Sequence, residues 1–130
     1  MIARDTAVIP MTPSADHTGK EGYFVEYAAG PKAAICNAAA DIPLGVIVDG
    51  ADTTGNSAVA TPAFGGTVKV KVTGTSPGTI NMGTYLTLKA DGTVQADAGS
   101  GARVRVARAL EAGAANELIE AYLMEPTALA

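Results

Sequence analysis

Thr67-Val68-Lys69-Val70-Lys71-Val72-Thr73 is the stretch that decides the fold class, because three valines alternate with polar residues at a period of two. Successive side chains of a β-strand point to opposite faces, so this pattern buries one face and leaves the other in water. Glycine and proline interrupt it on both sides, at Gly65-Gly66 and again over residues 74–78. The stretch therefore predicts a half-buried antiparallel strand.

Short runs of strand-forming residues recur on both sides of this strand, separated by Gly, Pro, Asp and Asn. Asp91-Gly92 lies between two alternating runs and predicts a hairpin. The last strand is expected to end at Pro126. The Ala-rich residues 38–41 or 112–117 could each form one helical turn. Together these runs predict an all-β protein, a small β-sandwich or barrel of about eight short, mostly antiparallel strands. The other runs cover residues 22–28, 44–48, 57–61, 85–89, 94–96, 102–107 and 118–124.

The length of 130 residues suits one core. We expect an extended N-terminal arm over residues 1–20, a single β-rich domain over 21–126 and a C-terminal tail over 127–130. Aromatic residues make up 5% of the chain and Trp is absent, so the core must be built from small side chains, mostly Ala and Val. Such a core buries little area per residue, which favours an oligomer.

The charge and residue counts argue against several kinds of partner. A net charge of −4 without a Lys/Arg run argues against nucleic acid. No run of 18 apolar residues occurs, so we expect no membrane partner, and no secretory signal is expected at the N-terminus. Cys36 is the single cysteine and His17 the single histidine. We therefore expect no disulfide, no metal site of the His/Cys kind and no cofactor.

The sequence contains no arrangement of residues that is typical of a catalytic site. His17 lies in the arm near Ser14 and Asp16, but neighbours in an extended segment point in different directions, so a solvated histidine is the simpler interpretation. Cys36 lies in an apolar setting and reads as a small buried residue. Most acidic residues fall in turns or at strand ends, where solvated side chains are typical. We expect a protein that is not an enzyme and acts through its surface.

The order of motifs resembles the capsid decoration, or cement, proteins of tailed bacteriophages. The resemblance covers most of residues 22–124. A Leu44-Gly45-Val46 segment precedes an Asp/Ala/Gly loop over 49–55, and the valine-alternating strand follows at 68–72. A Gly-x-x-Tyr strand then leads into the Asp-Gly hairpin over 83–94. One departure is Val106-Ala107, where relatives carry Ile/Val-Gly, which affects the geometry expected of that strand.

The resemblance implies a structural virion protein, made in the host bacterial cytoplasm, that binds the outer surface of an expanded head and stabilises its lattice. Its expected partners are the major capsid protein and further copies of itself, as a homotrimer. Strand addition and many weak contacts per shell suit this role.

Three sets of residues are candidates for these contacts. The arm would touch capsid subunits, with an apolar grip at its centre; its candidates are Ile2, Ile9, Pro10, Met11, His17 and Lys20. A second set would form the domain core or the trimer seam: Leu44, Val46, Val48, Ile119, Ala121 and Leu123. A cationic face would hold Lys69, Lys71, Arg103 and Arg105, for which ordinary solvated strand alternation is the competing interpretation.

Two other function classes stay open. A carbohydrate- or ligand-binding β-sandwich module would usually present aromatic rings on a flat face, and this chain has few. A small enzyme would need acidic residues from several strands. Glycan binding and a substrate screen discriminate these classes from shell binding.

Overall fold

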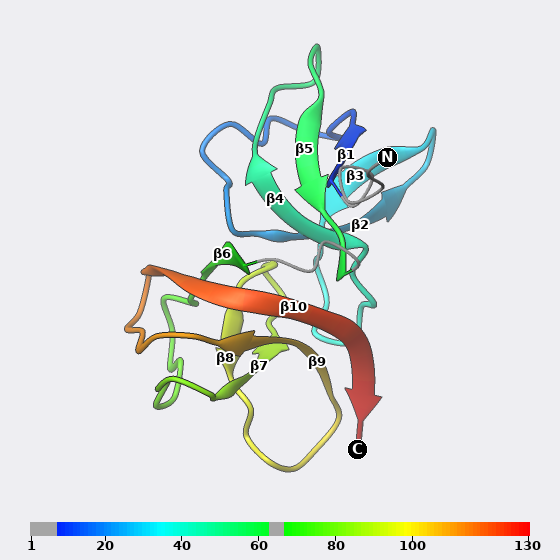
Figure 1. The fold of residues 1–130 in the computed structure, drawn as a ribbon. Helices are drawn as coiled ribbons and strands as arrows, with labels where there is room; N and C mark the ends of the chain where they lie inside the picture. Colours follow the sequence, from blue (N-terminus) through cyan, green and yellow to red (C-terminus); the bar gives the residue numbers. More distant parts are fainter. Residues whose placement is uncertain (1–7, 63–66) are drawn as a thin grey trace, which may run out of the picture.

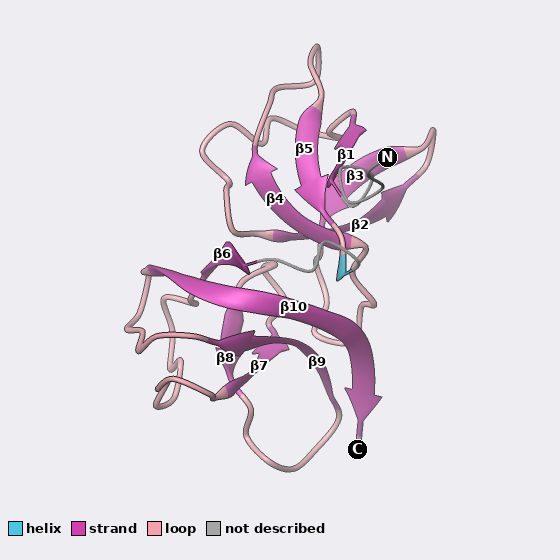
Figure 2. Cartoon of the chain, in the orientation of Figure 1, coloured by secondary structure: helices cyan, strands magenta, loops and turns pink. Residues whose placement is uncertain are grey.

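The computed structural model describes residues 8–62 and 67–130 and shows an all-β protein (Figure 1). Within these ranges ten strands form two antiparallel sheets of five strands each. No described residue lies in an α-helix, and the short piece drawn as helix in Figure 2 is a 3₁₀ turn at Pro62. We call the two sheets A and B. This architecture confirms the prediction of a small all-β fold built of packed antiparallel strands.

Sheet A has the strand order β1-β5-β4-β2-β3. It curls until its edges meet, because Pro13, which follows β1, forms a parallel bridge with Ala33 of β3. Each strand contributes one residue to a buried cluster, made of Met11, Val25, Ala33, Ile47 and Val59. The strands are β1 (Val8–Met11), β2 (Phe24–Ala28), β3 (Lys32–Ile35), β4 (Gly45–Asp49) and β5 (Ser57–Ala60).

Sheet B has the order β6-β10-β9-β7-β8 and closes in the same way, through a parallel bridge between Val72 and Val94. Its strands are β6 (Thr67–Lys71), β7 (Tyr85–Leu88), β8 (Val94–Ala96), β9 (Arg103–Ala109) and β10 (Leu118–Leu129). The alternation in β6 is confirmed: Val68 and Val70 are buried, whereas Thr67 and Lys69 are exposed. The predicted Asp-Gly hairpin is confirmed as well, since it joins β7 to β8.

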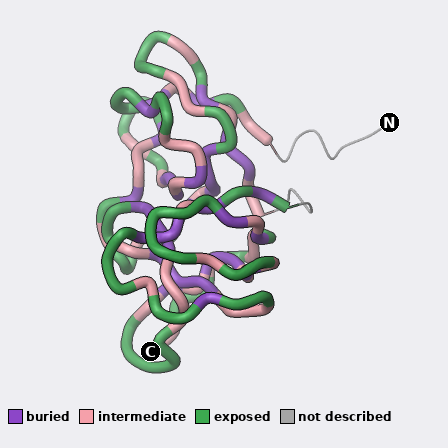
Figure 3. The backbone as a smooth tube through the Cα atoms, turned by 90° about the vertical axis from the view of Figure 1, so that its left-hand side faces the viewer, coloured by how far each residue is buried: buried purple, intermediate pink, exposed green. Residues whose placement is uncertain are grey.

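A second buried cluster joins the two sheets. The inward valines of sheet B share it with four residues of sheet A or its connections, namely Phe24, Cys36, Val46 and Ala60. Neighbours in β4 and β5 therefore pack on opposite sides: Val46 packs toward sheet B, and Ile47 lies in the cluster of sheet A. Buried residues occur throughout the middle of the molecule (Figure 3).

The structure corrects the expectation of an extended arm over residues 1–20. Val8–Met11 is strand β1 and pairs with β5, and the N–H of Ser14 donates to the carbonyl oxygen of Ala33 at 2.8 Å. The sequence pattern did not predict this strand, because Pro10 is atypical of strands. β1 is an edge strand, where a missing N–H is tolerated. Residues 1–7 lie outside the described ranges, and so does Ile2.

The C-terminal boundary needs a second correction. β10 does not end before Pro126 but continues to Leu129, and residues Thr127–Leu129 pair with Arg103–Arg105 of β9. The register shifts between Leu123 and Thr127, so Pro126 falls in an irregularity where no ladder N–H is required. The expected tail over 127–130 is therefore largely strand.

The two Ala-rich segments form turns instead of a helical turn. The Asp41 carboxylate accepts the N–H groups of Asn37 and Ala38, both at 3.0 Å. Asn116 has a positive φ of 68°, which a helix does not allow. In the described part of the chain, no helix is long and apolar enough to cross a membrane.

Candidate interaction surface

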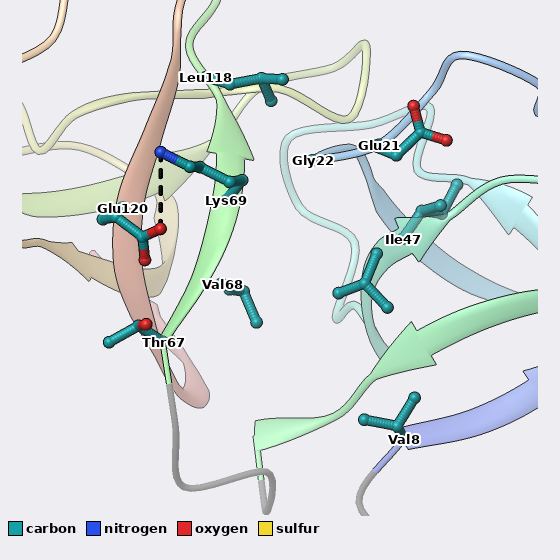
Figure 4. A pocket seen from close by; sticks show the side chains of 10 residues that line it. Val8, Glu21, Gly22, Ile47, Thr67, Val68, Lys69, Leu118 and Glu120 are labelled. Carbon is teal, nitrogen blue, oxygen red and sulfur yellow. Dashed lines mark ion pairs between the residues drawn. The ribbon is translucent and has the colours of Figure 1, made fainter.

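A cleft of about 550 Å³ lies between the two sheets. Sheet B contributes the edge strand β6 and the start of β10, and sheet A contributes β1, β4 and the segment before β2. Figure 4 shows Val68 and Val8 on opposite sides of this space. The cleft residues are Val8, Glu21, Gly22, Ile47, Val48, Thr67, Val68, Lys69, Leu118 and Glu120.

On the side of β6 that faces sheet A, part of the strand edge has no main-chain partner among the described residues. The N–H of Val72 donates to Glu117 in front of β10, whereas the N–H of Lys71 donates to Gly22. Because successive residues of a strand point their N–H and C=O groups to alternate sides, those of Thr67 and Lys69 point the same way as the N–H of Lys71. Neither residue makes a main-chain hydrogen bond to any described residue on that side.

Apolar side chains line the cleft next to this edge. Val48 of β4 is 38% exposed and Leu118 of β10 is 45% exposed, although both are large hydrophobic residues. Val68 is 5% exposed, and Val8 packs against the shared core. The cleft thus combines open main-chain donors and acceptors with an apolar lining, which is the requirement for receiving an extended strand.

Carboxylates predominate at the rim. The Lys69 ammonium lies 3.5 Å from the Glu120 carboxylate (Figure 4). It also lies 3.7 Å from the Glu111 carboxylate, so one ammonium group pairs with two acidic side chains. The second oxygen of Glu120, Oε2, is buried without a hydrogen-bond partner in the described structure. On the other side, Glu21 Oε2 accepts the N–H of Gly50 at 2.9 Å. The rim therefore carries a net negative charge.

The four residues of the predicted cationic face are all bound within the chain and form two separate pairs. Lys71 Nζ donates to the carbonyl oxygen of Asn116 at 2.8 Å, and Lys69 is held by its two acids. Arg103 and Arg105 both bind Asp97. In the ladder, β6 pairs with the first half of β10 and the two arginines pair with its end, roughly 20 Å further along the strand.

Asp97 is the centre of the second pair. Burial acts to raise the pKa of this carboxyl, but hydrogen bonds from Arg105, the N–H of Gly99 and Arg103 outweigh it and lower the pKa to about 2. Arg105 Nη2 approaches Asp97 Oδ2 at 2.6 Å, and the Arg105 guanidinium also lies 4.1 Å from the centre of the Tyr85 ring. Arg108 lies over the same ring at 4.8 Å. These contacts anchor the loop before β9.

Two of the predicted arm contacts, Met11 and His17, are enclosed by the fold. Met11 is 7% exposed, His17 is 2% exposed and Ile9 is half-buried. The prediction of a solvated histidine was wrong: desolvation lowers the pKa of His17 more than the nearby Asp16 carboxylate raises it. Pro10 is exposed and Lys20 is half-exposed over the ring of Tyr23, at 5.0 Å.

The residues assigned to a core or a seam belong mostly to the core. Val46, Ile119 and Ala121 are at most 2% exposed and lie in the shared cluster, with Leu123 packed against it. Leu44 packs against the cluster of sheet A. Val48 is the exception, because it faces the cleft.

Sequence reasoning missed the other cleft residues, Gly22, Glu21, Leu118 and Glu120 among them. Of these residues, only Gly22 could have been noticed in the sequence, because a glycine directly before a strand can indicate a close approach of two main-chain segments. Its φ is +90°, and an added Cβ would lie 2.5 Å from Leu118 Cδ2 and 2.8 Å from the Lys71 nitrogen. The two sheets approach closely here because Gly22 has no side chain.

The described residues hold no group of three or more His, Cys, Asp and Glu side chains that could bind a metal ion. Cys36 is 1% exposed, and burial, followed by the nearby Glu26 and Asp41 carboxylates, raises the pKa of its thiol to about 12. Such a thiol is not a nucleophile at neutral pH.

The comparisons with known proteins assign no family to the chain. No protein-family model matches it, and no curated protein matches it either.

Proposed function

We propose that this protein is a capsid decoration protein, which binds the outer surface of an expanded bacteriophage head and stabilises the shell lattice. The proposal is supported by where two of the segments that resemble decoration proteins lie in the fold. Leu44-Gly45-Val46 covers the start of β4, and Val68–Val72 covers most of β6 and the residue after it; these two strands line opposite sides of the cleft.

The proposed role needs binding area and strand edges but no reactive group. The cleft offers an open edge at Thr67 and Lys69 beside apolar side chains. A lattice presents many copies of the same site, so contacts that are individually weak add up to stable attachment. The proposed partners are the major capsid protein and further copies of this chain, with the virion exterior as the location.

Of the arm residues proposed to touch the shell, only the accessible ones remain useful contacts in the folded protein. Pro10 and Lys20 meet this condition among the described residues. Met11 and His17 act instead by holding the segment against sheet A.

Aromatic geometry gives little support to the carbohydrate-binding alternative. Two guanidinium groups lie over the Tyr85 ring, at 4.1 and 4.8 Å, and the two exposed tyrosines, Tyr27 and Tyr122, lie in different sheets. A glycan array with the purified protein tests this alternative directly, and a substrate screen tests the enzymatic one.

Co-sedimentation with expanded heads of the encoding phage, prepared without this protein, tests the proposal. We expect the protein to sediment with the heads and to raise their disruption temperature, while unexpanded heads bind less. Lys20→Glu is expected to weaken binding, and Lys32→Glu, an exposed lysine of β3, serves as the matched control. Absence of co-sedimentation for the full chain overturns the proposal.

A further inference from the structure

We propose that the outer face of sheet B carries a second binding site, in which Arg108 and the tyrosines on either side of it bind a carboxylate on an acidic segment of the shell subunit. We call Tyr85, Arg108 and Tyr122 the tyrosine–arginine row. None of the three residues lines the cleft. The inference rests on the proposed function for the identity of the partner.

The tyrosine–arginine row crosses the three adjacent strands β7, β9 and β10 (Figure 1). Arg108 is the ladder partner of Tyr85 on one side and of Tyr122 on the other. Residues directly opposite each other in a ladder share one face of the sheet. The row lies on the outer face, because its neighbours along these strands belong to the shared buried cluster. These neighbours are Leu86, Ala107, Ala109 and Ala121.

Arg108 is held in place by uncharged groups. Its Nε donates to the carbonyl oxygen of Gly83 at 3.0 Å, and its guanidinium lies 4.8 Å from the centre of the Tyr85 ring. A hydrogen bond with the Tyr122 side chain is the main cause that raises the pKa of Arg108, so the guanidinium stays charged at neutral pH. These contacts orient the group without neutralising it.

The acids near the row already have cationic partners. Asp97 binds two other arginines, and Glu120, two positions before Tyr122 in β10, pairs with Lys69. In the described part of the chain, no ion pair joins an acid to Arg108. The row therefore offers a positive charge to a carboxylate from outside, which a planar guanidinium can bind through two charge-assisted hydrogen bonds.

The side chains around Arg108 are of the kinds that protein interfaces favour, since tyrosine, methionine and arginine are enriched there. Tyr122 is 39% exposed, and Met82, which directly precedes Gly83, is 75% exposed. The net charge of −4 repels partners that are dense in phosphate. A single carboxylate on a protein segment fits this surface better.

NMR titration of the unaltered chain tests the chemistry of the ligand. The signals of the Arg108 Nε–H and of the Tyr85 and Tyr122 rings are followed while a blocked peptide of four glutamates is added. We expect these signals to shift and to saturate, and we expect no shift with a blocked peptide of four glutamines. Absence of shifts with the glutamate peptide, or equal shifts with inorganic phosphate at the same ionic strength, overturns the inference.

Co-sedimentation with expanded heads tests the partner. Arg108→Gln is expected to weaken binding about tenfold, as for the loss of one well-placed interface arginine. Lys32→Gln, at an exposed lysine of sheet A, is the matched control and should leave binding unchanged. Equal losses for the two variants would indicate a general charge effect and overturn the inference.

The outcomes with heads separate this inference from the proposed function. If Arg108→Gln binds heads as well as the unaltered chain does, the inference fails and the proposed function stands. If the unaltered chain does not sediment with heads, the proposed function fails, and the inference fails with it. Because the NMR titration uses the unaltered chain, the inference stays open to refutation even where a variant does not fold.

Discussion

The main-chain N–H of Lys71 donates a hydrogen bond of 3.0 Å to the carbonyl oxygen of Gly22. The N–H of Gly22 in turn donates to Ile47 of β4 at 2.8 Å. One glycine therefore ties the edge strand of sheet B to sheet A, and these two bonds close one end of the cleft. The cleft keeps its shape because this corner is fixed by main-chain bonds and not by flexible side chains.

Gly22→Ala is expected to destabilise the protein by about 3 kcal/mol. The alanine Cβ would collide with the main-chain nitrogen of Lys71, at 2.8 Å, and a φ of +90° is strained for any L side chain. Gly19→Ala is the matched control, with a φ of +77° but nothing within 4 Å of the added Cβ, and should cost only about 1 kcal/mol. Urea unfolding of the two variants measures the difference, and equal losses would contradict the role of the corner.

Val46→Ala and Val48→Ala are expected to differ although the residues are two positions apart in β4. Val46 is fully buried between the sheets, so its truncation should cost about 2 kcal/mol through lost burial and a cavity. Val48 is 38% exposed in the cleft, and its truncation should cost about 0.5 kcal/mol or less. Thermal unfolding of both variants at low protein concentration checks this, and a larger loss at Val48 would place it in a core.

His17 is expected to make the stability depend on pH in mildly acidic solution. Burial lowers its pKa below the ordinary value of 6.5. As the pH decreases, His17 therefore becomes protonated in the unfolded chain before it does so in the folded chain. Stability is then complete above pH 6.5 and falls as the pH decreases through that value, with a slope of at most about 1.4 kcal/mol per pH unit.

Urea unfolding midpoints at pH 7.5 and 6.0 measure this effect, and NMR titration of His17 in the unaltered chain reports its pKa directly. In His17→Gln the difference between the two pH values should shrink. A His17 pKa at or above 6.5 would refute the prediction.

Asp97→Asn is expected to destabilise the protein by roughly 1–2 kcal/mol at pH 7, since Arg103 and Arg105 would lose their shared carboxylate. The pKa of Asp97 is lowered from 3.8 to about 2, so its contribution is complete above pH 4 and is lost as the pH falls from about 4 toward 2. Glu125→Gln, an exposed residue of β10, is the control and should change stability little. Acid unfolding curves that coincide for the Asp97→Asn variant and the unaltered chain would contradict this account.

The sequence predicted the strands whose patterns are local. Val68, Val70 and Val72 alternate over one strand, and the Asp91-Gly92 turn joins neighbours in the chain, so both were readable without a partner. β1 was missed because its stability comes from β5, about 50 residues away, and because Pro10 and Pro13 are typical of loops. His17 was misjudged for a similar reason: it is buried only because Gly50 lets its carbonyl approach, with an added Cβ only 2.1 Å from the His17 oxygen.

The candidate site could not be predicted in the same way. Val8, Val48, Val68 and Leu118 are ordinary apolar residues at four separate places in the chain, and only the packing of the sheets brings them to one cleft. For the lysines and arginines, the sequence predicted the position but not the binding partners. Their alternation placed them on an outer face, but the sequence did not reveal that Glu111, Glu120 and Asp97 already bind three of them.

By itself, the sequence determined the fold class, the hairpin and the small-residue core, because period-two alternation and turn chemistry act over a few neighbouring residues. Only the tertiary structure decided which strands lie at the edges, how the two sheets meet at Gly22 and which side of β6 stays open. Those features depend on pairing between distant segments, and the free energy of that pairing comes from groups that no short window of sequence contains.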